Sequence, residues 1–436
     1  MPPFASWMLE QEARSMLTRL ARVRPFALQE SMLPAANLLP ASQTAIEEFL
    51  MRGRGHLRAL VDGFLGWLRS PEGARAGAEE AQRRFAMLRL RFNAVLTQFD
   101  MFNDLMTQRS ENETGVWLSG LDVVSADALR LPGNFFEAPP IICYLDRGVG
   151  AAIRRARTRM PGGGLSPVAI VKVPRERMVG SGIASSLLHE VGHQAAALLG
   201  LVESLRPALR AAGQRGSADA RAWQFWERWI SEIVADLWSV ARVGVASTMG
   251  LMAVVSLPRA FVFRLNTDDP HPTPWIRVKL SAAIGSALYP QPIWGQLVDL
   301  WESYYPLRGT DPEQDGTLSM LDRTIPELVT ILIHHRPEAL QGSSFSEALD
   351  LGEMQPGRLR NLLQRWRSAP QEMYEARPIL VLAVIGQGRA DGAISPEEES
   401  IVLGKLLTHW ALKSTLQAAA GCTTDPSHHC ECKARK

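Results

Sequence analysis

The chain has 436 residues, a length that favours two or three domains over one. Hydrophobic residues make up 46% of the sequence and charged residues 21%, which is typical of a globular protein and excludes a disordered one. The 47 basic and 45 acidic residues nearly balance, so the net charge of +2 gives no reason to expect a nucleic acid or an anionic membrane as partner.

The sequence contains no pattern typical of a secretory signal or a membrane span. Its N-terminus lacks a basic start followed by an apolar run. The longest apolar stretch, residues 243–258, includes Ser, Thr and Gly and is shorter than the roughly 20 residues that a bilayer requires. Four cysteines in a chain of this size do not indicate a disulfide framework. We therefore expect a cytoplasmic protein without a membrane span.

The spacing of apolar residues predicts a mostly α-helical α+β fold with a small β-sheet, organised in four parts. Residues 1–134 favour helices, as shown by apolar side chains at helical spacing between residues 82 and 105. Residues 135–308 combine short β-type runs with helices and contain the chemical motifs. Residues 309–420 favour helices again, and the polar residues 421–436 indicate a tail.

Within the second part, two short β-type runs come before the predicted helices. They lie at 141–145 and 168–173 and are rich in Ile and Val. The residues between them, 146–160, favour a helix. Further helices are expected at about 182–205 and 222–243, separated by a polar segment that contains glycine.

The first of these helices contains a His-Glu-x-x-His pattern, formed by His189, Glu190 and His193. Residues four apart on a helix lie on the same face, so the two imidazoles can bind one zinc ion. Glu190 follows the first histidine. It can take a proton from the attacking water and pass it to a leaving amine, which makes it the predicted catalytic residue.

A catalytic zinc needs a third protein ligand, and the nearest candidates are excluded. Metzincin-type enzymes would have Gly and His where this chain has Ala196 and Leu199. Glu203 follows His193 by ten residues, which on a continuous helix places it about 15 Å along the axis. The third ligand must therefore come from another helix.

Glu232, on the helix predicted at 222–243, is the best candidate for the third ligand. Asp236 lies four residues later on the same face and could accept a hydrogen bond from a ligand histidine, fixing its tautomer. Glu227 is the alternative, but Ser231 and not an acidic residue follows it at that spacing. A solvated surface carboxylate is the other interpretation of Glu232.

A third motif lies downstream, where His271 begins a His-Pro turn and Arg277 follows six residues later. The order His-Glu-x-x-His, Glu-x-x-x-Asp and His-Pro with this Arg resembles the HtpX, Oma and CAAX-prenyl-protease family of gluzincins over roughly residues 135 to 290. That family usually has Thr before the His and a second Pro two residues after it; here Pro270 and Thr273 take those places.

The resemblance implies a compact gluzincin core that binds one zinc ion per chain. It implies that 168–173 is the edge strand that pairs with an extended peptide. It also implies that His271 and Arg277 polarise the scissile carbonyl or support Glu232, although a His-Pro turn with an Arg salt bridge is an equally good structural interpretation. Most members of the family are integral membrane proteases, whereas this sequence contains no spanning helices.

We therefore expect a zinc metallopeptidase that hydrolyses peptide or protein substrates. Two other functions stay open: a non-proteolytic scaffold with a relict or structural metal site, and a zinc hydrolase acting on a small amide. The helical regions on either side of the core could bind a regulatory protein partner.

Three remaining patterns have both structural and functional interpretations. Trp223, Trp226 and Trp229 are spaced for core packing or for a substrate wall, and packing is the expected role. Residues 387–398 resemble an EF-hand loop but lack its first two acidic ligands, and instead predict a helix start capped by Ser395. Their context is weakly similar to helical domains of the tellurite-resistance TerB type.

The C-terminal tail contains residues that could bind a second zinc ion. Thiolates and imidazoles are zinc ligands, but a Cys-x-Cys pair at a chain end lacks the usual paired arrangement. A disordered tail is the expected state. The candidate ligands are Cys422, His428, His429, Cys430 and Cys432.

Overall fold

The computed structural model describes the chain except for a few short segments and the C-terminus. The residues not described are 23–32, 147–149, 161–162, 181, 216–218, 267–268, 309–310, 350 and 425–436. Within the described residues the protein is mostly helical with one small sheet, so the predicted fold class is confirmed. None of the helices described is long and apolar enough to cross a membrane. Of the predicted zinc ligands in the tail, His428, His429, Cys430 and Cys432 lie outside the described residues.

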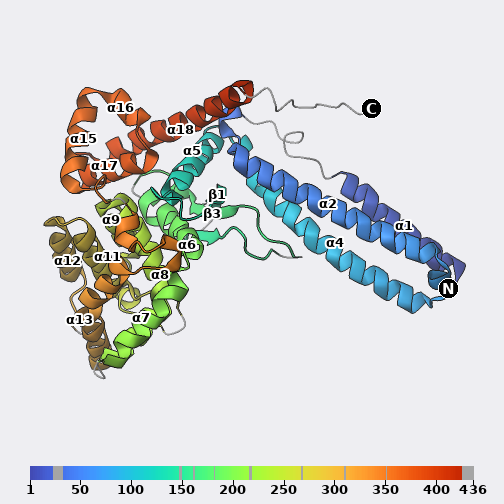
Figure 1. Cartoon of the computed structure of the whole chain (residues 1–436), viewed down its shortest axis with the longest axis horizontal. Coiled ribbons are helices and arrows are strands. Elements are labelled where there is room, and N and C mark those ends of the chain that lie inside the picture. The colour runs from blue at the N-terminus through green and yellow to red at the C-terminus, as the bar shows by residue number, and fades with distance from the viewer. Residues whose placement is uncertain are drawn as a thin grey trace.

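Three long helices near the N-terminus form an arm that extends away from the rest of the molecule (Figure 1). They are α1 (Pro3–Ala21), α2 (Pro40–Arg69) and α4 (Ala78–Thr107), and the short α3 (Pro71–Arg75) connects the last two. Their apolar stripes pack together around a core of their own, which includes the buried Met16, Ile46 and Phe92.

The sheet has three strands in the order β1-β3-β2. β1 (Ile141–Asp146) and β3 (Ala169–Pro174) are parallel, whereas β2 (Ala152–Arg154) is antiparallel to β3. The prediction of an edge strand at 168–173 is therefore wrong: β3 is central, and β2 forms that edge.

The helix predicted at 146–160 is also wrong, because the described part of this segment contains β2 and irregular chain. Helix propensity is a weak preference that tertiary contacts override. Here the contact is the pairing of Ile153 with Val171 of β3, which a local pattern could not reveal.

The two faces of the sheet pack against different parts of the protein. Ile141, Cys143 and Leu145 point into the main core, on the side of α5 (Asn112–Leu129). Ile142 and Ile170, on the opposite face, belong to the core of the arm. The sheet thus connects the arm to the body, as expected for alternating side chains on a strand.

The predicted helix at 182–205 is divided into three elements. A single π-helical turn (Ile183–Leu187) leads into α6 (Leu188–Leu198), and α7 (Leu201–Arg215) follows. Gly200 separates α6 from α7 and has φ of 61°, a conformation that side-chain-bearing residues rarely adopt. The helix predicted at 222–243 is present as α8 (Ala220–Val243).

One hydrophobic core extends from α5 to α18 and includes the helices that follow α8. Trp223, Trp226 and Trp229 are buried in it, which confirms their predicted packing role. Ser395 caps α18, with its Oγ accepting from the Glu398 N–H at 3.2 Å, also as predicted. The remaining helices are α9 (Val245–Val255), α10 (Arg259–Val262), α11 (Pro274–Leu288), α12 (Ile293–Tyr304), α13 (Pro312–His334), α14 (Phe345–Ala348), α15 (Pro356–Ser368), α16 (Pro370–Glu375), α17 (Pro378–Ala390) and α18 (Pro396–Thr424).

Candidate metal centre

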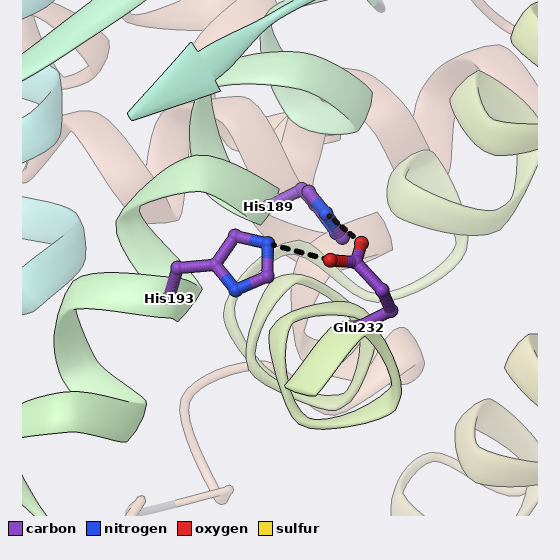
Figure 2. A group of neighbouring side chains, drawn as sticks. All are labelled: His189, His193 and Glu232. Atoms are coloured by element: carbon purple, nitrogen blue, oxygen red, sulfur yellow. Dashed lines mark hydrogen bonds and ion pairs between the residues drawn. The ribbon is translucent and has the colours of Figure 1, made fainter. Parts of the chain in front are cut away.

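Two helices bring the residues of the His-Glu-x-x-His motif next to Glu232. α6 carries His189, Glu190 and His193, and α8 carries Glu232. The two helices approach closely because Gly192 faces α8: a Cβ atom at this position would lie 2.8 Å from the carbonyl oxygen of Ala235. Figure 2 shows both imidazoles pointing at the Glu232 carboxylate between them.

The three predicted ligands converge on one point. His189 Nε2 lies 3.1 Å from Glu232 Oε2, and His193 Nε2 lies 3.4 Å from Glu232 Oε1. Their ligand atoms all lie within 4.8 Å of one another, and no other group of three or more His, Cys, Asp or Glu with this geometry occurs among the described residues. Two imidazole nitrogens and a carboxylate oxygen are the donor set of catalytic zinc sites, so these residues fit a divalent metal ion.

A second layer of buried groups holds His189 in position. Its Nδ1–H donates to Asp236 Oδ1 at 2.8 Å, which leaves Nε2 facing Glu232. Arg277, at the start of α11, binds the same carboxylate through both of its oxygens, at 2.7 and 2.9 Å. Such partners orient a metal ligand and fix its tautomer.

His189 lies between two carboxylates, those of Asp236 and Glu232. Burial lowers the pKa of His189, but Asp236 and Glu232 outweigh that effect and raise the pKa to about 9. Burial raises the pKa values of Glu232 and Asp236, but contacts with the histidines and Arg277 hold both well below their usual range. A metal ion would replace the proton on His189 Nε2.

Glu190 and His271 complete the group of predicted residues around this centre. Burial raises the pKa of the Glu190 carboxyl, despite the opposing effect of the two ligand histidines. His271 is half-exposed, and its Nε2 lies 3.3 Å from Glu232 Oε2. The structure therefore places His271 at the same carboxylate that the two ligand histidines contact.

Comparison with protein-family models, with curated proteins and with solved structures finds no match to this chain.

The structure adds two side chains that the sequence analysis did not select. Asp269 Oδ1 accepts a hydrogen bond from His271 Nδ1 at 2.7 Å and another from the His271 backbone N–H at 3.0 Å. Ser231 Oγ lies 3.4 Å from His193 Nδ1. The Asp-x-His spacing could have indicated the first contact, because an Asp side chain often binds the backbone two residues on. No local pattern indicates the second.

Glu227, the alternative third ligand, faces away from the histidines. Its carboxylate forms ion pairs with Arg206 and Arg210 of α7, and these contacts hold the pKa of Glu227 below its usual range. The geometry thus favours Glu232, as the sequence analysis did.

Proposed function

We propose that the protein is a zinc metallopeptidase that hydrolyses peptide bonds. The observation that carries this proposal is the convergence of His189, His193 and Glu232, with Glu190 adjoining them on α6. When bound, a zinc ion would act as a Lewis acid, which polarises the scissile carbonyl and lowers the pKa of the water it binds.

Glu190 is suited to move a proton in this site. Its raised pKa reflects a largely buried carboxyl, and a base whose pKa is closer to neutral can both accept a proton from water and release it to a leaving amine. The position next to His189 keeps this carboxyl beside the metal ligands without making it one of them.

His271 and Arg277 have separate roles in this proposal. Asp269 accepts a hydrogen bond from Nδ1 of His271 and so holds Nε2 toward the metal centre, where it would contact an oxyanion that develops at the scissile carbonyl. Arg277 instead binds Asp236 and thereby holds His189. The substrate would pair with β2, the edge strand, and not with β3.

A cytoplasmic location belongs to the same proposal. Cys143 is a free, buried thiol, as expected in a reducing compartment. A regulatory partner would bind the arm of α1, α2 and α4, which extends from the body (Figure 1).

The test is a Glu190→Gln variant assayed on a fluorescence-quenched peptide mixture. The amide keeps the shape but cannot accept a proton, so turnover should fall by roughly 10²-fold or more while zinc content and thermal unfolding stay unchanged. Glu227→Gln, on the neighbouring helix α8, is the matched control and should retain activity. Zinc binding without hydrolysis by the wild-type protein would instead support a scaffold with a structural metal site.

A further inference from the structure

Positive charge is concentrated on one segment of a chain that is otherwise nearly neutral. Between Asp146 and Glu176 the sequence contains seven Arg and Lys residues and no Asp or Glu. Four of the seven lie within six consecutive positions, on β2 and the chain that follows it, and all four side chains are exposed. We call these four the arginine strip: Arg154, Arg155, Arg157 and Arg159.

The charges of the arginine strip are hardly neutralised within the protein. Arg157 Nη2 lies 3.7 Å from Glu137 Oε2, and both side chains are largely exposed. Water screens such a pair, so Glu137 neutralises little of the charge of Arg157. In the part of the chain that the structure describes, no ion pair joins Arg154, Arg155 or Arg159 to a carboxylate. Their guanidinium groups are therefore available to an anionic ligand.

The strip begins on a strand with an open edge. β2 pairs with β3 on one side, and within the described ranges no strand pairs with its other side. An unpaired edge offers backbone N–H and C=O groups to an added extended segment, which is how many proteins bind peptides.

A direct contact connects the strip to the metal centre. The backbone N–H of Ala156, between Arg155 and Arg157, donates to Gln194 Oε1 at 2.8 Å. Gln194 is buried on α6 immediately after His193. An extended segment bound along β2 would therefore run beside the helix that carries the two ligand histidines.

The chemistry of the strip favours a peptide over a nucleic acid. Residues 147–175 include no Phe, Tyr, Trp or His, whereas proteins that bind single strands stack bases on aromatic side chains. Guanidinium groups bind carboxylates through paired hydrogen bonds. The Asp and Glu side chains of an extended peptide supply such carboxylates.

We propose that the arginine strip and the open edge of β2 bind an acidic, extended segment of the protein substrate. The main chain of that segment pairs with β2, and its carboxylates bind the arginines. This inference rests on the proposed peptidase function and names the class of substrate that the site receives.

The test measures binding separately from hydrolysis. The zinc-loaded Glu190→Gln protein is titrated with a short fluorescent peptide of alternating Glu and Val, with its Lys-for-Glu counterpart, and with an oligothymidylate. The acidic peptide should bind best, with an affinity that falls as salt rises. Replacing the strip with Gln (Arg154→Gln, Arg155→Gln, Arg157→Gln, Arg159→Gln) should weaken binding about 15- to 80-fold, since each of the four exposed Arg–carboxylate pairs contributes roughly two- to threefold.

A matched variant on the arm removes the same charge elsewhere. It replaces four exposed arginines of α2 and α4 (Arg58→Gln, Arg83→Gln, Arg89→Gln, Arg91→Gln) and should bind the acidic peptide within about twofold of the parent protein. Equal losses in both variants, or equal binding of the Lys peptide, would overturn the inference. If the oligothymidylate binds more tightly than the acidic peptide, and the strip variant no longer binds it, the strip is a nucleic-acid site instead.

Wild-type turnover separates this inference from the function on which it rests. Binding of the acidic peptide to the strip without cleavage of any peptide contradicts the proposed function alone. Cleavage of the Lys peptide as fast as the Glu peptide, with zinc and Glu190 both required, contradicts the inference alone.

Discussion

The close approach of α6 and α8 at Gly192 should control how tightly the protein holds its metal. A Cβ atom at Gly192 would lie 2.8 Å from the Ala235 carbonyl oxygen, 2.9 Å from Ala235 Cα and 3.0 Å from Trp238 Cβ. Ordinary contact begins at 3.4 Å, so Gly192→Ala must move the helices apart locally by roughly 0.6 Å, the difference between 3.4 and 2.8 Å. Two of these obstacles are backbone atoms, which cannot rotate away.

The same displacement acts on the metal centre, because Ala235 lies directly before Asp236. The His189–Asp236 hydrogen bond, now 2.8 Å, would lengthen toward the limit of a useful contact. We expect zinc affinity to fall about 10- to 100-fold, as when a supporting partner of a ligand is lost. The free energy of unfolding should change less. Overpacking lowers it by about 1–3 kcal/mol, but replacing a helical Gly by Ala raises it by about 1 kcal/mol.

The assay combines competition against a graded zinc chelator with urea unfolding of the metal-free protein. Gly63→Ala on α2 is the matched control, since a Cβ there meets nothing within 4 Å; it should leave zinc affinity unchanged and stabilise the arm by about 0.5–1 kcal/mol. If Gly192→Ala releases zinc at the same chelator strength as the wild type, the close approach of the helices does not position the ligands.

Three further predictions concern the same centre. The purified protein should contain about one zinc ion per chain, and a His189→Ala, His193→Ala double variant should contain none by elemental analysis; unchanged zinc would place the metal elsewhere. Asp236→Ala should lower zinc affinity about 10- to 100-fold in chelator competition, and a wild-type value would exclude a supporting role. In the metal-free protein, the pKa of His189 is raised from 6.5 to about 9, so its stabilising contribution is complete below pH 6.5 and is lost as pH rises through 9. Urea unfolding at pH 7 and 8.5 should therefore show a loss of about 1–2 kcal/mol, and a gain over that interval would contradict the assignment.

Local patterns were enough to predict much of the candidate site. The four-residue spacing of His189 and His193, and of Glu232 and Asp236, defines helix faces without knowledge of the fold. The burial of the tryptophan stripe and the cap at Ser395 were predicted on the same basis. These features depend on residues within a few positions of one another, so the sequence alone determines them.

The tertiary structure decided whatever depends on residues far apart in the chain. Strand β2 exists because Ile153 pairs with Val171, and this pairing overrides the helical pattern of residues 146–160 and makes β3 central. Glu227 and Glu232 lie on one helix, and no local pattern distinguishes their surroundings. Packing against α7 places Glu227 beside arginines, whereas Glu232 contacts the histidines of α6. The contact of Ser231 with His193 likewise depends on how α6 and α8 meet. The free energy of each contact is set by the three-dimensional neighbours, which no local spacing encodes.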